Sequence, residues 1–404
     1  MTSCRLCKSP SLVHLLDLGQ QPISNRFLSG PDQAEYTHPM LMGQCEECAM
    51  VQTVDSAPAE ELVPPFDWIS YNEPEGHLDQ LVERIVNLTG SKDGATVCGV
   101  SFKDVSTLER LEGRGAGSTW LIDPERDLGI HDPRAGIETI QGRLTPDTAR
   151  RLTGKHGQAD VVVVRHILEH AHDTDSFMSA IKLLARPDGC IVFEVPDCSR
   201  ALETLDYSCP WEEHVLYFTP ATFQRCLTAN GLSLVETHCY PYPFENSLVA
   251  IVSPSEEGAE NGSVETLDFD DIQRDRDSWK SYSGSLDAHR ERLRSKLEET
   301  RWAGGKIVLF GAGHLAAFYI NLFGLQDLVE FVVDDNPHKK GLRMPGSRLP
   351  ILGSEMLLDN EIKLCLLSLS PESAAKVIEN NQSFLDQGGT FSSIFPSSEM
   401  ALAI

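Results

Sequence analysis

The chain has 404 residues, 41% of them hydrophobic and 23% charged, which predicts two or three globular domains and excludes a fibrous or wholly disordered protein. Its 34 basic and 60 acidic side chains give a net charge of −26, which opposes non-specific binding to nucleic acids or anionic membranes. The first residues are not those of a secretion signal, and no apolar run approaches the ~20 residues that span a bilayer. We therefore expect a cytoplasmic protein whose partner is a small molecule, with neither nucleic acid nor membrane among its partners.

Four of the eleven cysteines stand in two pairs near the start of the chain. Cys4 and Cys7 form one CxxC sequence, and Cys45 and Cys48 form another. Two-residue spacing lets both thiolates of a pair face one ion, and two pairs supply the four sulfur ligands of a tetrahedral zinc site. We predict a structural Zn²⁺ in a module of residues 1–60. A redox dithiol is the alternative for each pair.

From about residue 95, short apolar runs alternate with helical segments. Runs at 96–100, 119–123, 159–164 and 190–195 predict parallel strands joined by crossover helices. A predicted helix at 221–231 ends at a glycine, and 233–240 and 247–253 then predict an antiparallel hairpin. The pattern indicates a doubly wound α/β domain of residues 61–255.

This order of elements resembles the seven-stranded, class I S-adenosylmethionine-dependent methyltransferases. In that family the strand ends lie beside the methyl donor, which implies Gly99, Asp123, Arg165 and His166 as cofactor-binding residues. A carboxylate at the end of the second strand, here Asp123, can accept both ribose hydroxyls. Only Gly99 stands where a glycine-rich turn is typical. A non-catalytic protein or one with a different ligand is therefore the alternative.

An acidic, polar segment and a second nucleotide-type pattern complete the chain. Residues 254–280 predict an exposed connection, and 285–304 a charged helix, so we place a linker and helix at 256–303. Residues 304–404 open with a strand, Gly311-x-Gly313 and a helix, and a second strand ends at Asp334. The glycines permit a tight turn and close approach of a phosphate to the helix N-terminus. We predict a Rossmann-like α/β domain, in which Lys339, Lys340 and Arg343 either meet phosphates or form a solvated turn.

The layout of the whole chain resembles the zinc-containing C-methyltransferases that act on nucleotide-linked keto-deoxysugars. The resemblance rests on both CxxC pairs, DLGxxPxxN at 17–25, WISYNEPEGHLD at 68–79, EEHVLYFTP at 212–220 and the C-terminal Gly-Ala-Gly. In that family the C-terminal domain helps to hold a nucleotide-linked sugar rather than a redox cofactor. NAD binding and a purely structural role are the alternatives. The resemblance implies six substrate-binding residues: Trp211, Glu212, Gly311, Gly313, His314 and Asp334.

The catalytic residues are likewise implied by this resemblance. The family's Tyr-His-Glu-His reads Trp211-Glu212-Glu213-His214 here, so that His214 becomes the base beside Glu213. Carbon is a poor nucleophile until an adjacent ketone lets it become an enolate, and histidine suits the proton abstraction. Tyr71 and His77 are candidates to stabilise the enolate oxygen. Methylation of oxygen or another acceptor, and a non-catalytic nucleotide-sugar-binding protein, are the alternatives. His166 and His170 are additional candidates for the pocket wall.

Overall fold

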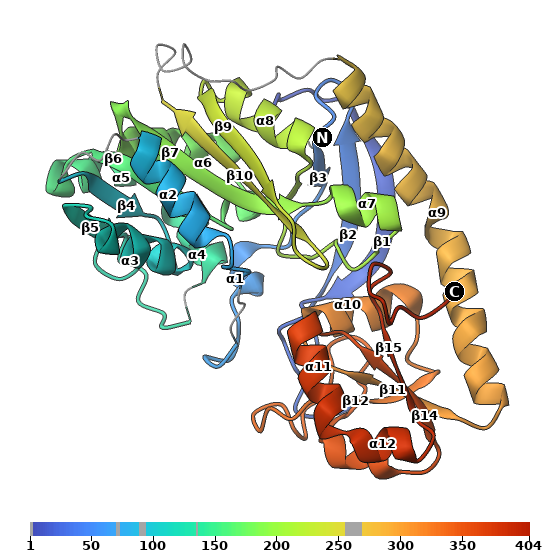
Figure 1. Cartoon of the computed structure of the whole chain (residues 1–404). Helices are drawn as coiled ribbons and strands as arrows, with labels where there is room; N and C mark the ends of the chain where they lie inside the picture. Colours follow the sequence, from blue (N-terminus) through green and yellow to red (C-terminus); the bar gives the residue numbers. More distant parts are fainter. Residues whose placement is uncertain (1–2, 70–72, 89–93, 135, 255–268) are drawn as a thin grey trace.

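The computed structural model describes residues 3–69, 73–88, 94–134, 136–254 and 269–404. These residues form three β-sheets of four, six and five strands (Figure 1). Tyr71, implied above as a catalytic residue, lies outside the described residues. Within the same ranges, no helix combines the length and the apolarity required to cross a bilayer.

The first sheet joins the N-terminal segment to a strand from the middle of the chain. Its order is β1-β2-β3-β8, and all its pairs are antiparallel. Because β8 begins at Leu216, two residues after His214, this sheet fixes one end of the predicted catalytic segment. The elements are β1 (Leu12–Pro22), β2 (Thr37–Cys45), β3 (Val51–Thr53), α1 (Ala59–Leu62) and β8 (Leu216–Tyr217).

The second sheet confirms the predicted doubly wound domain. Its order is β5-β4-β6-β7-β10-β9, in which the first four strands are parallel and the predicted hairpin adds β10 and β9 in the antiparallel direction. The described residues give this sheet six strands rather than the seven typical of the family. Its strands are β4 (Thr96–Gly99), β5 (Ser118–Leu121), β6 (Ala159–Arg165), β7 (Ala185–Asp197), β9 (Ser233–Tyr240) and β10 (Asn246–Ser253). The helices are α2 (Leu78–Leu88), α3 (Val105–Gly113), α4 (Ile137–Arg143), α5 (Pro146–His156), α6 (Thr174–Leu184), α7 (Ser199–Thr204) and α8 (Pro220–Ala229), with 3-10 turns at Phe102–Asp104 and Leu168–His170.

Strand β6 is apolar on both faces, as a central strand of a covered parallel sheet requires. Val161 and Val163 pack in one core cluster with residues of α2 and α3. Val162 and Val164 pack in another cluster with residues of α4, α5 and α6. Successive side chains of a strand point to opposite faces, so the run of four valines supplies both cores.

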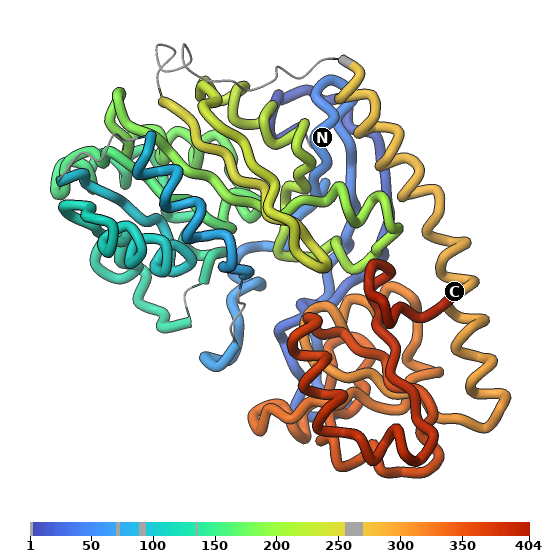
Figure 2. The backbone as a smooth tube through the Cα atoms, viewed as in Figure 1, coloured from blue at the N-terminus to red at the C-terminus, as the bar shows by residue number. Residues whose placement is uncertain are grey.

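Helix α9 (Phe269–Trp302) corrects the predicted exposed connection at 254–280. The helix includes the part of that segment from residue 269, and it runs past the four-stranded sheet to the C-terminal part of the chain (Figure 2). Trp279 and Tyr282 are 1% and 0% exposed. The buried apolar side chains of α9 recur at helical spacing and form one stripe along the helix. The many acidic residues around this stripe made the segment look like an exposed linker in the sequence. Its buried apolar residues are Ile272, Trp279, Tyr282, Leu286, Leu293 and Leu297.

The third sheet confirms the predicted Rossmann-like domain. Its order is β13-β12-β11-β14-β15, and every pair is parallel. Strand β12 lies on one side of β11 and β14 lies on the other, so the strand order reverses at β11. Such a reversal is a switch point, and ligands of open α/β sheets bind there, at the carboxyl ends of the strands. The elements are β11 (Lys306–Phe310), α10 (His314–Phe323), β12 (Val329–Val333), β13 (Ile351–Leu352), a 3-10 helix (Ser354–Leu358), β14 (Ile362–Leu367), α11 (Pro371–Asn380), α12 (Gln382–Asp386) and β15 (Thr390–Ser393).

The segment between β1 and β2 also contacts the C-terminal domain. Leu28 forms an isolated antiparallel bridge with Arg343. Glu35 accepts a hydrogen bond from the backbone N–H of Gly346 at 2.7 Å. The N-terminal sheet and its loops therefore touch both α/β units, through β8 on one side and through this segment on the other.

Candidate functional site

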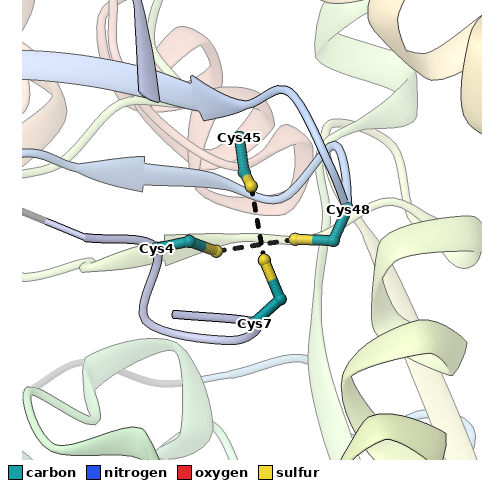
Figure 3. A group of neighbouring side chains, drawn as sticks. All are labelled: Cys4, Cys7, Cys45 and Cys48. Atoms are coloured by element: carbon teal, nitrogen blue, oxygen red, sulfur yellow. Dashed lines mark hydrogen bonds between the residues drawn. The ribbon is translucent and has the colours of Figure 1, made fainter. Parts of the chain in front are cut away.

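The four paired cysteines converge as the spacing predicts. Their ligand atoms all lie within 4.8 Å of one another, and the Sγ atoms of Cys4 and Cys48, and of Cys7 and Cys45, are 3.5 Å apart (Figure 3). Sulfurs bound at about 2.3 Å to one tetrahedral ion would be about 3.8 Å apart, so the cluster fits zinc. Each pair sits on a turn, in which the N–H of Lys8 or of Ala49 bonds back to the carbonyl of the first cysteine.

The loop after β1 connects the zinc module to the predicted catalytic segment. Ser24 donates its backbone N–H to Glu212 Oε1 at 2.6 Å, and its hydroxyl bonds to the same oxygen. Asn25 Nδ2 donates to Glu213 Oε1 at 2.9 Å. Both glutamates are 6% exposed, so these donors satisfy buried carboxylates. Glu212 is thus engaged by the protein, and the zinc module positions the loop that precedes β8.

A cavity of about 650 Å³ lies at the carboxyl ends of β4 and β6. Phe102, Val105 and Ile137 give it apolar walls, and Lys103 and Arg165 add cationic groups. Nη2 of Arg165 is buried with no hydrogen-bond partner among the described residues. An apolar wall beside a buried guanidinium suits a ligand that carries both a flat apolar group and a carboxylate. Other lining residues include Leu62, Phe66, Glu73, Glu138, His170, Trp211 and Glu213.

Asp104 organises the turn where glycines are typical of the methyltransferase family. Its Oδ2 accepts the backbone N–H groups of Val100 and Ser101 at 2.7 and 2.8 Å, and its Oδ1 accepts that of Arg165 at 2.9 Å. Burial raises the pKa of Asp104 to about 7 despite these donors. The carboxylate ties β4 to β6, so the turn is held by side-chain hydrogen bonds rather than by glycine conformations.

Gly99 and Asp123 do not line this cavity. A Cβ atom on Gly99 would lie 2.8 Å from Leu108 and 2.9 Å from Leu121, so close packing explains the glycine. Asp123 follows β5 as predicted, its side chain is 40% exposed, and it accepts the backbone N–H of Arg126 at 2.8 Å. Its role toward a cofactor ribose stays a prediction.

Arg165 and His166 meet on one buried carboxylate. Glu194, on β7, accepts hydrogen bonds from Arg165 Nε at 2.5 Å and lies 3.1 Å from His166 Nε2. Burial alone would lower the pKa of His166, but Glu73 and Glu194 raise it well above its ordinary value. His166 has a φ of 48°, a left-handed conformation that is rare outside glycine and that turns the chain sharply after β6.

His77 belongs to the same buried cluster. Its Nδ1 is 2.7 Å from the hydroxyl of Tyr242, and its Nε2 is 3.2 Å from Glu194. His77 does not line the cavity described above. Nε2 approaches Glu194 without a hydrogen bond among the described residues, and the ring faces Tyr242 and Glu194 behind the cavity wall rather than a substrate oxygen.

His214 lies against two residues that line the cavity. Its ring centroid is 4.8 Å from that of His170 and 4.9 Å from that of Trp211. Burial, followed by the charge of His170, lowers the pKa of His214 well below its ordinary value. For His170, by contrast, the carboxylate of Glu138 overcomes burial and raises the pKa. No hydrogen bond joins Glu213 to His214 in the described parts of the chain, although the two are sequence neighbours.

A second cavity, of about 270 Å³, lies at the switch point of the C-terminal sheet. His314 lines it and stacks on Trp211, with ring centroids 4.4 Å apart, so one aromatic pair separates the two cavities. Phe27 and Trp68 form an aromatic wall, with ring centroids 5.9 Å apart. Other lining residues are Ser24, Asn25, Ile69, Ala312, Gly313, Leu315, Asn336, Lys339 and Ser368.

Asp334 does not line the second cavity, although it occupies the position of a ribose-binding acid. Its Oδ2 accepts the backbone N–H of Ala312 at 2.9 Å and pairs with Lys339 at 3.0 Å. Gly311 has a φ of 104°, and a Cβ there would lie 2.7 Å from Leu369, so the turn requires glycine. These contacts use Asp334 to shape the turn, which disfavours the NAD alternative.

Sequence reasoning missed several residues that build the two cavities. Ser24 and Asn25 stand in the DLGxxPxxN segment, which carries part of the family resemblance but which by itself predicts no role for either side chain. Phe102 and Lys103 replace the expected glycines. Glu138 belongs to none of the sequence motifs, and its carboxylate meets His170 only in the folded chain.

Three sequence families match consecutive parts of the chain. Residues 4–62 match a family described as "Putative zinc binding domain", residues 65–237 match "Methyltransferase domain", and residues 253–396 match "C-methyltransferase C-terminal domain". No curated protein matches the chain.

Several solved structures of methyltransferases resemble part of the chain. One is the 1,6-didemethyltoxoflavin-N1-methyltransferase of Burkholderia thailandensis, at 14% identity, covering 44% of this chain and 79% of that chain, with a TM-score of 0.30. Another is the magnesium protoporphyrin IX methyltransferase of Synechocystis PCC 6803, at 15% identity, covering 46% and 91%, with a TM-score of 0.29. A third is the N-methyltransferase NodS of Bradyrhizobium japonicum, at 13% identity, covering 45% and 99%, with a TM-score of 0.28.

The family matches follow the order of the three sheets, and the four-cysteine cluster falls within the zinc-binding match. The cofactors are thus S-adenosylmethionine, for the methyltransferase domain, and Zn²⁺, held by Cys4, Cys7, Cys45 and Cys48. Together the three family models match the chain to a zinc-containing family of C-methyltransferases, and the chain is an S-adenosylmethionine-dependent methyltransferase.

Proposed function

We propose that this enzyme transfers a methyl group to a carbon atom of a nucleotide-linked keto-deoxysugar. The observation that carries the proposal is the contact between Trp211 and His314, at 4.4 Å between ring centroids, which makes two cavities neighbours. The cavity of about 650 Å³ suits the methyl donor together with the sugar. The cavity of about 270 Å³ suits the nucleotide. An acceptor that reaches both has to be long, as a nucleotide-linked sugar is.

The residues of the second cavity support a nucleotide as its ligand. Phe27 and Trp68 offer aromatic faces on which a base can stack. Lys339 also lines the cavity, and its ammonium group suits a phosphate. Gly313 precedes helix α10, and the N-terminal end of the helix dipole adds a partial positive charge at the same place. Base and diphosphate would then point the sugar past His314 toward Trp211.

S-adenosylmethionine supplies the electrophilic methyl group when it is bound, and Arg165 would take its carboxylate. The chain itself has to supply a base. His214 is that base in our proposal, because its lowered pKa keeps the imidazole neutral and able to accept a proton at neutral pH. Its contacts with His170 and Trp211 put it next to the cavity wall. Proton removal from the carbon beside the ketone gives the enolate, whose carbon then takes the methyl group.

The substitutions of the family's Tyr-His pair by Trp211 and Glu212 are consistent with the same reaction. Glu212 is satisfied by Ser24, and the indole Nε1 of Trp211 lies 3.3 Å from the hydroxyl of Ser24. Trp211 lines the larger cavity, and Glu212, which lines neither cavity, holds the loop behind it through Ser24. We infer that they tune which sugar fits, while His214 keeps its role.

Product analysis tests the proposal. The enzyme is incubated with methyl-labelled S-adenosylmethionine and a panel of nucleotide-linked 4-keto and 3-keto deoxysugars, and products are located by mass and by carbon–proton correlation NMR. A new methyl signal on carbon, in a product heavier by one methylene unit, supports the proposal. A methyl on oxygen, or transfer to sugars that lack a ketone at the same rate, would refute carbon methylation.

A further inference from the structure

Three buried side chains on the wall of the larger cavity bring two carboxylates and an imidazole together. Glu138, His170 and Glu213 each offer a ligand atom, and these atoms lie within 4.8 Å of one another. The three residues are 4%, 5% and 6% exposed, and all three line the cavity of about 650 Å³. The cluster is separate from the four cysteines.

The charges in this cluster are incompletely compensated by the protein. Glu138 Oε1 pairs with His170 Nδ1, whereas Oε2 of Glu138 is buried without a hydrogen bond among the described residues and has His172 Nε2 at 3.7 Å as its charged neighbour. Glu213 receives one hydrogen bond, from Asn25. The cations that line the cavity are paired with other carboxylates: Lys103 with Glu73 at 2.7 Å, Arg165 with Glu194 and Arg134 with Asp132. An unpartnered carboxylate oxygen in a buried site is costly unless a proton or a cation joins it.

Electrostatics agree with crowding of negative charge. Burial, then the charge of Glu138 and then that of Glu212, raises the pKa of Glu213 well above its ordinary value. The pKa of Glu212 is raised as well, by burial first and with a contribution from Glu138. Burial would raise the pKa of Glu138, but His170 and His172 overcome it and lower that pKa, so Glu213 is the carboxylate of the cluster that resists ionisation.

We propose that Glu138, His170 and Glu213 form a second metal site, which binds a divalent first-row transition ion in the active cavity. Carboxylate and imidazole ligands suit such an ion, and three protein ligands leave a position open toward the cavity. Ligand atoms bound at about 2.0–2.2 Å to one ion lie about 3–4 Å apart, so the cluster needs only small side-chain movements. Binding would release the proton shared by His170 and Glu138 and any proton on Glu213.

The role of this ion rests on the proposed function. Proton removal by His214 puts negative charge on the acceptor's carbonyl oxygen, which has to be stabilised. His77, a candidate for that task, faces Tyr242 and Glu194 and does not line the cavity. An ion on Glu138, His170 and Glu213 faces the same cavity and would polarise the carbonyl as a Lewis acid. The ring of His170 lies 4.8 Å from that of His214, so the ion and the base would act side by side.

Cobalt substitution tests the site without any methyl transfer. The metal-free protein is titrated with Co²⁺, whose spectrum distinguishes a four-thiolate site, with intense charge-transfer bands, from an oxygen and nitrogen site, with weak visible bands alone. We expect two Co²⁺ per chain in the wild type and one, in the thiolate site, in E138Q/E213Q. The control E212Q changes a neighbouring buried carboxylate outside the cluster and should keep both ions.

Two results would overturn the site: a wild-type protein that binds one Co²⁺, with thiolate bands only, or a folded E138Q/E213Q protein that still binds two. Far-ultraviolet circular dichroism and a cooperative unfolding transition show that a variant is folded, since thiolate bands report on the N-terminal cysteines alone. The role is tested separately, by chelating the weaker site while the zinc site stays loaded. Carbon methylation at an unchanged rate after chelation would refute the Lewis-acid role but leave the proposed function intact. Two bound ions without carbon methylation of any sugar would leave the site intact and refute the proposed function.

Discussion

Two neighbouring imidazoles carry opposite pKa shifts at the wall of the larger cavity. Burial and the charge of His170 lower the pKa of His214, whereas Glu138 overcomes the effect of burial and raises that of His170. Their rings are 4.8 Å apart, so each disfavours a second positive charge on the other. Environments that push two pKa values apart usually identify the base and its partner in a proton transfer. The unprotonated member is His214, which agrees with the base that the family resemblance implies.

Replacement of His214 by asparagine tests the base directly. We expect His214→Asn to reduce the chemical step by roughly 10²–10⁴-fold, because asparagine cannot take up a proton, while the affinity for S-adenosylmethionine stays nearly unchanged. Single-turnover kinetics and calorimetry give the two quantities. Exchange of the acceptor's acidic proton with deuterated water, followed by NMR, should disappear as well. Near-wild-type turnover, or retained exchange, would contradict the assignment.

The lowered pKa of His214 predicts the shape of the pH profile. Activity that depends on the neutral imidazole should persist below pH 6.5, the ordinary histidine value, and fall only as the pH approaches the lower folded-state pKa. The free energy of unfolding should depend on pH in the same direction as the activity. The unfolded chain binds a proton at the ordinary value, so the contribution of His214 is complete above that pH and is lost as the pH falls below it. Kinetics from pH 5 to 8 measure the pH dependence of activity, and urea unfolding over the same range measures that of stability. His214→Asn should remove the part of the pH dependence of stability that comes from this histidine.

Strand pairing links the zinc module to the active cavity. Val51 and Gln52 of β3 pair with Tyr217 and Leu216 of β8, directly after the Glu212–His214 segment. Ser24 and Asn25, on the loop after β1, hold the two glutamates of that segment. A short two-residue strand has little stability of its own, so its position depends on the zinc-bearing sheet beside it.

Loss of zinc should therefore weaken catalysis more than cofactor binding. Cys4→Ser/Cys45→Ser removes one thiolate from each pair, which should abolish stoichiometric zinc because both turns lose a ligand. We expect the sheet to loosen and the chemical step to slow by at least about tenfold, since the base would lose its alignment. Cys190→Ser/Cys239→Ser, which alters two cysteines outside the cluster, is the matched control. Metal analysis measures the zinc content, and single-turnover kinetics measure the chemical step. Full activity in a zinc-free, folded variant would show that the zinc module does not contribute to catalysis.

At the scale of the whole molecule, the sequence predicted the fold types better than the site. Hydrophobic alternation and the cysteine spacing predicted the zinc cluster and both α/β sheets, since these depend on local periodicity. The site depends on contacts between distant segments, such as Asn25 with Glu213 and Trp211 with His314, which no local pattern encodes. The start of α9 was misplaced because its acidic composition outweighed a sparse apolar stripe.

The second cavity predicts how the C-terminal domain contributes to substrate binding. Lys339 lines this cavity beside Phe27 and Asn336, whereas its neighbour Lys340 lies near Asp335 and Glu355 and does not. Lys339→Ala should weaken binding of UDP and dTDP about tenfold or more, because one charge-assisted contact to a phosphate is worth roughly 1.5–3 kcal/mol. Lys340→Ala carries the same loss of charge and should bind both nucleotides like the wild type. Titration calorimetry at fixed ionic strength makes the comparison. Equal weakening by both variants would indicate only a long-range charge effect, and no weakening by either would remove the nucleotide from this cavity.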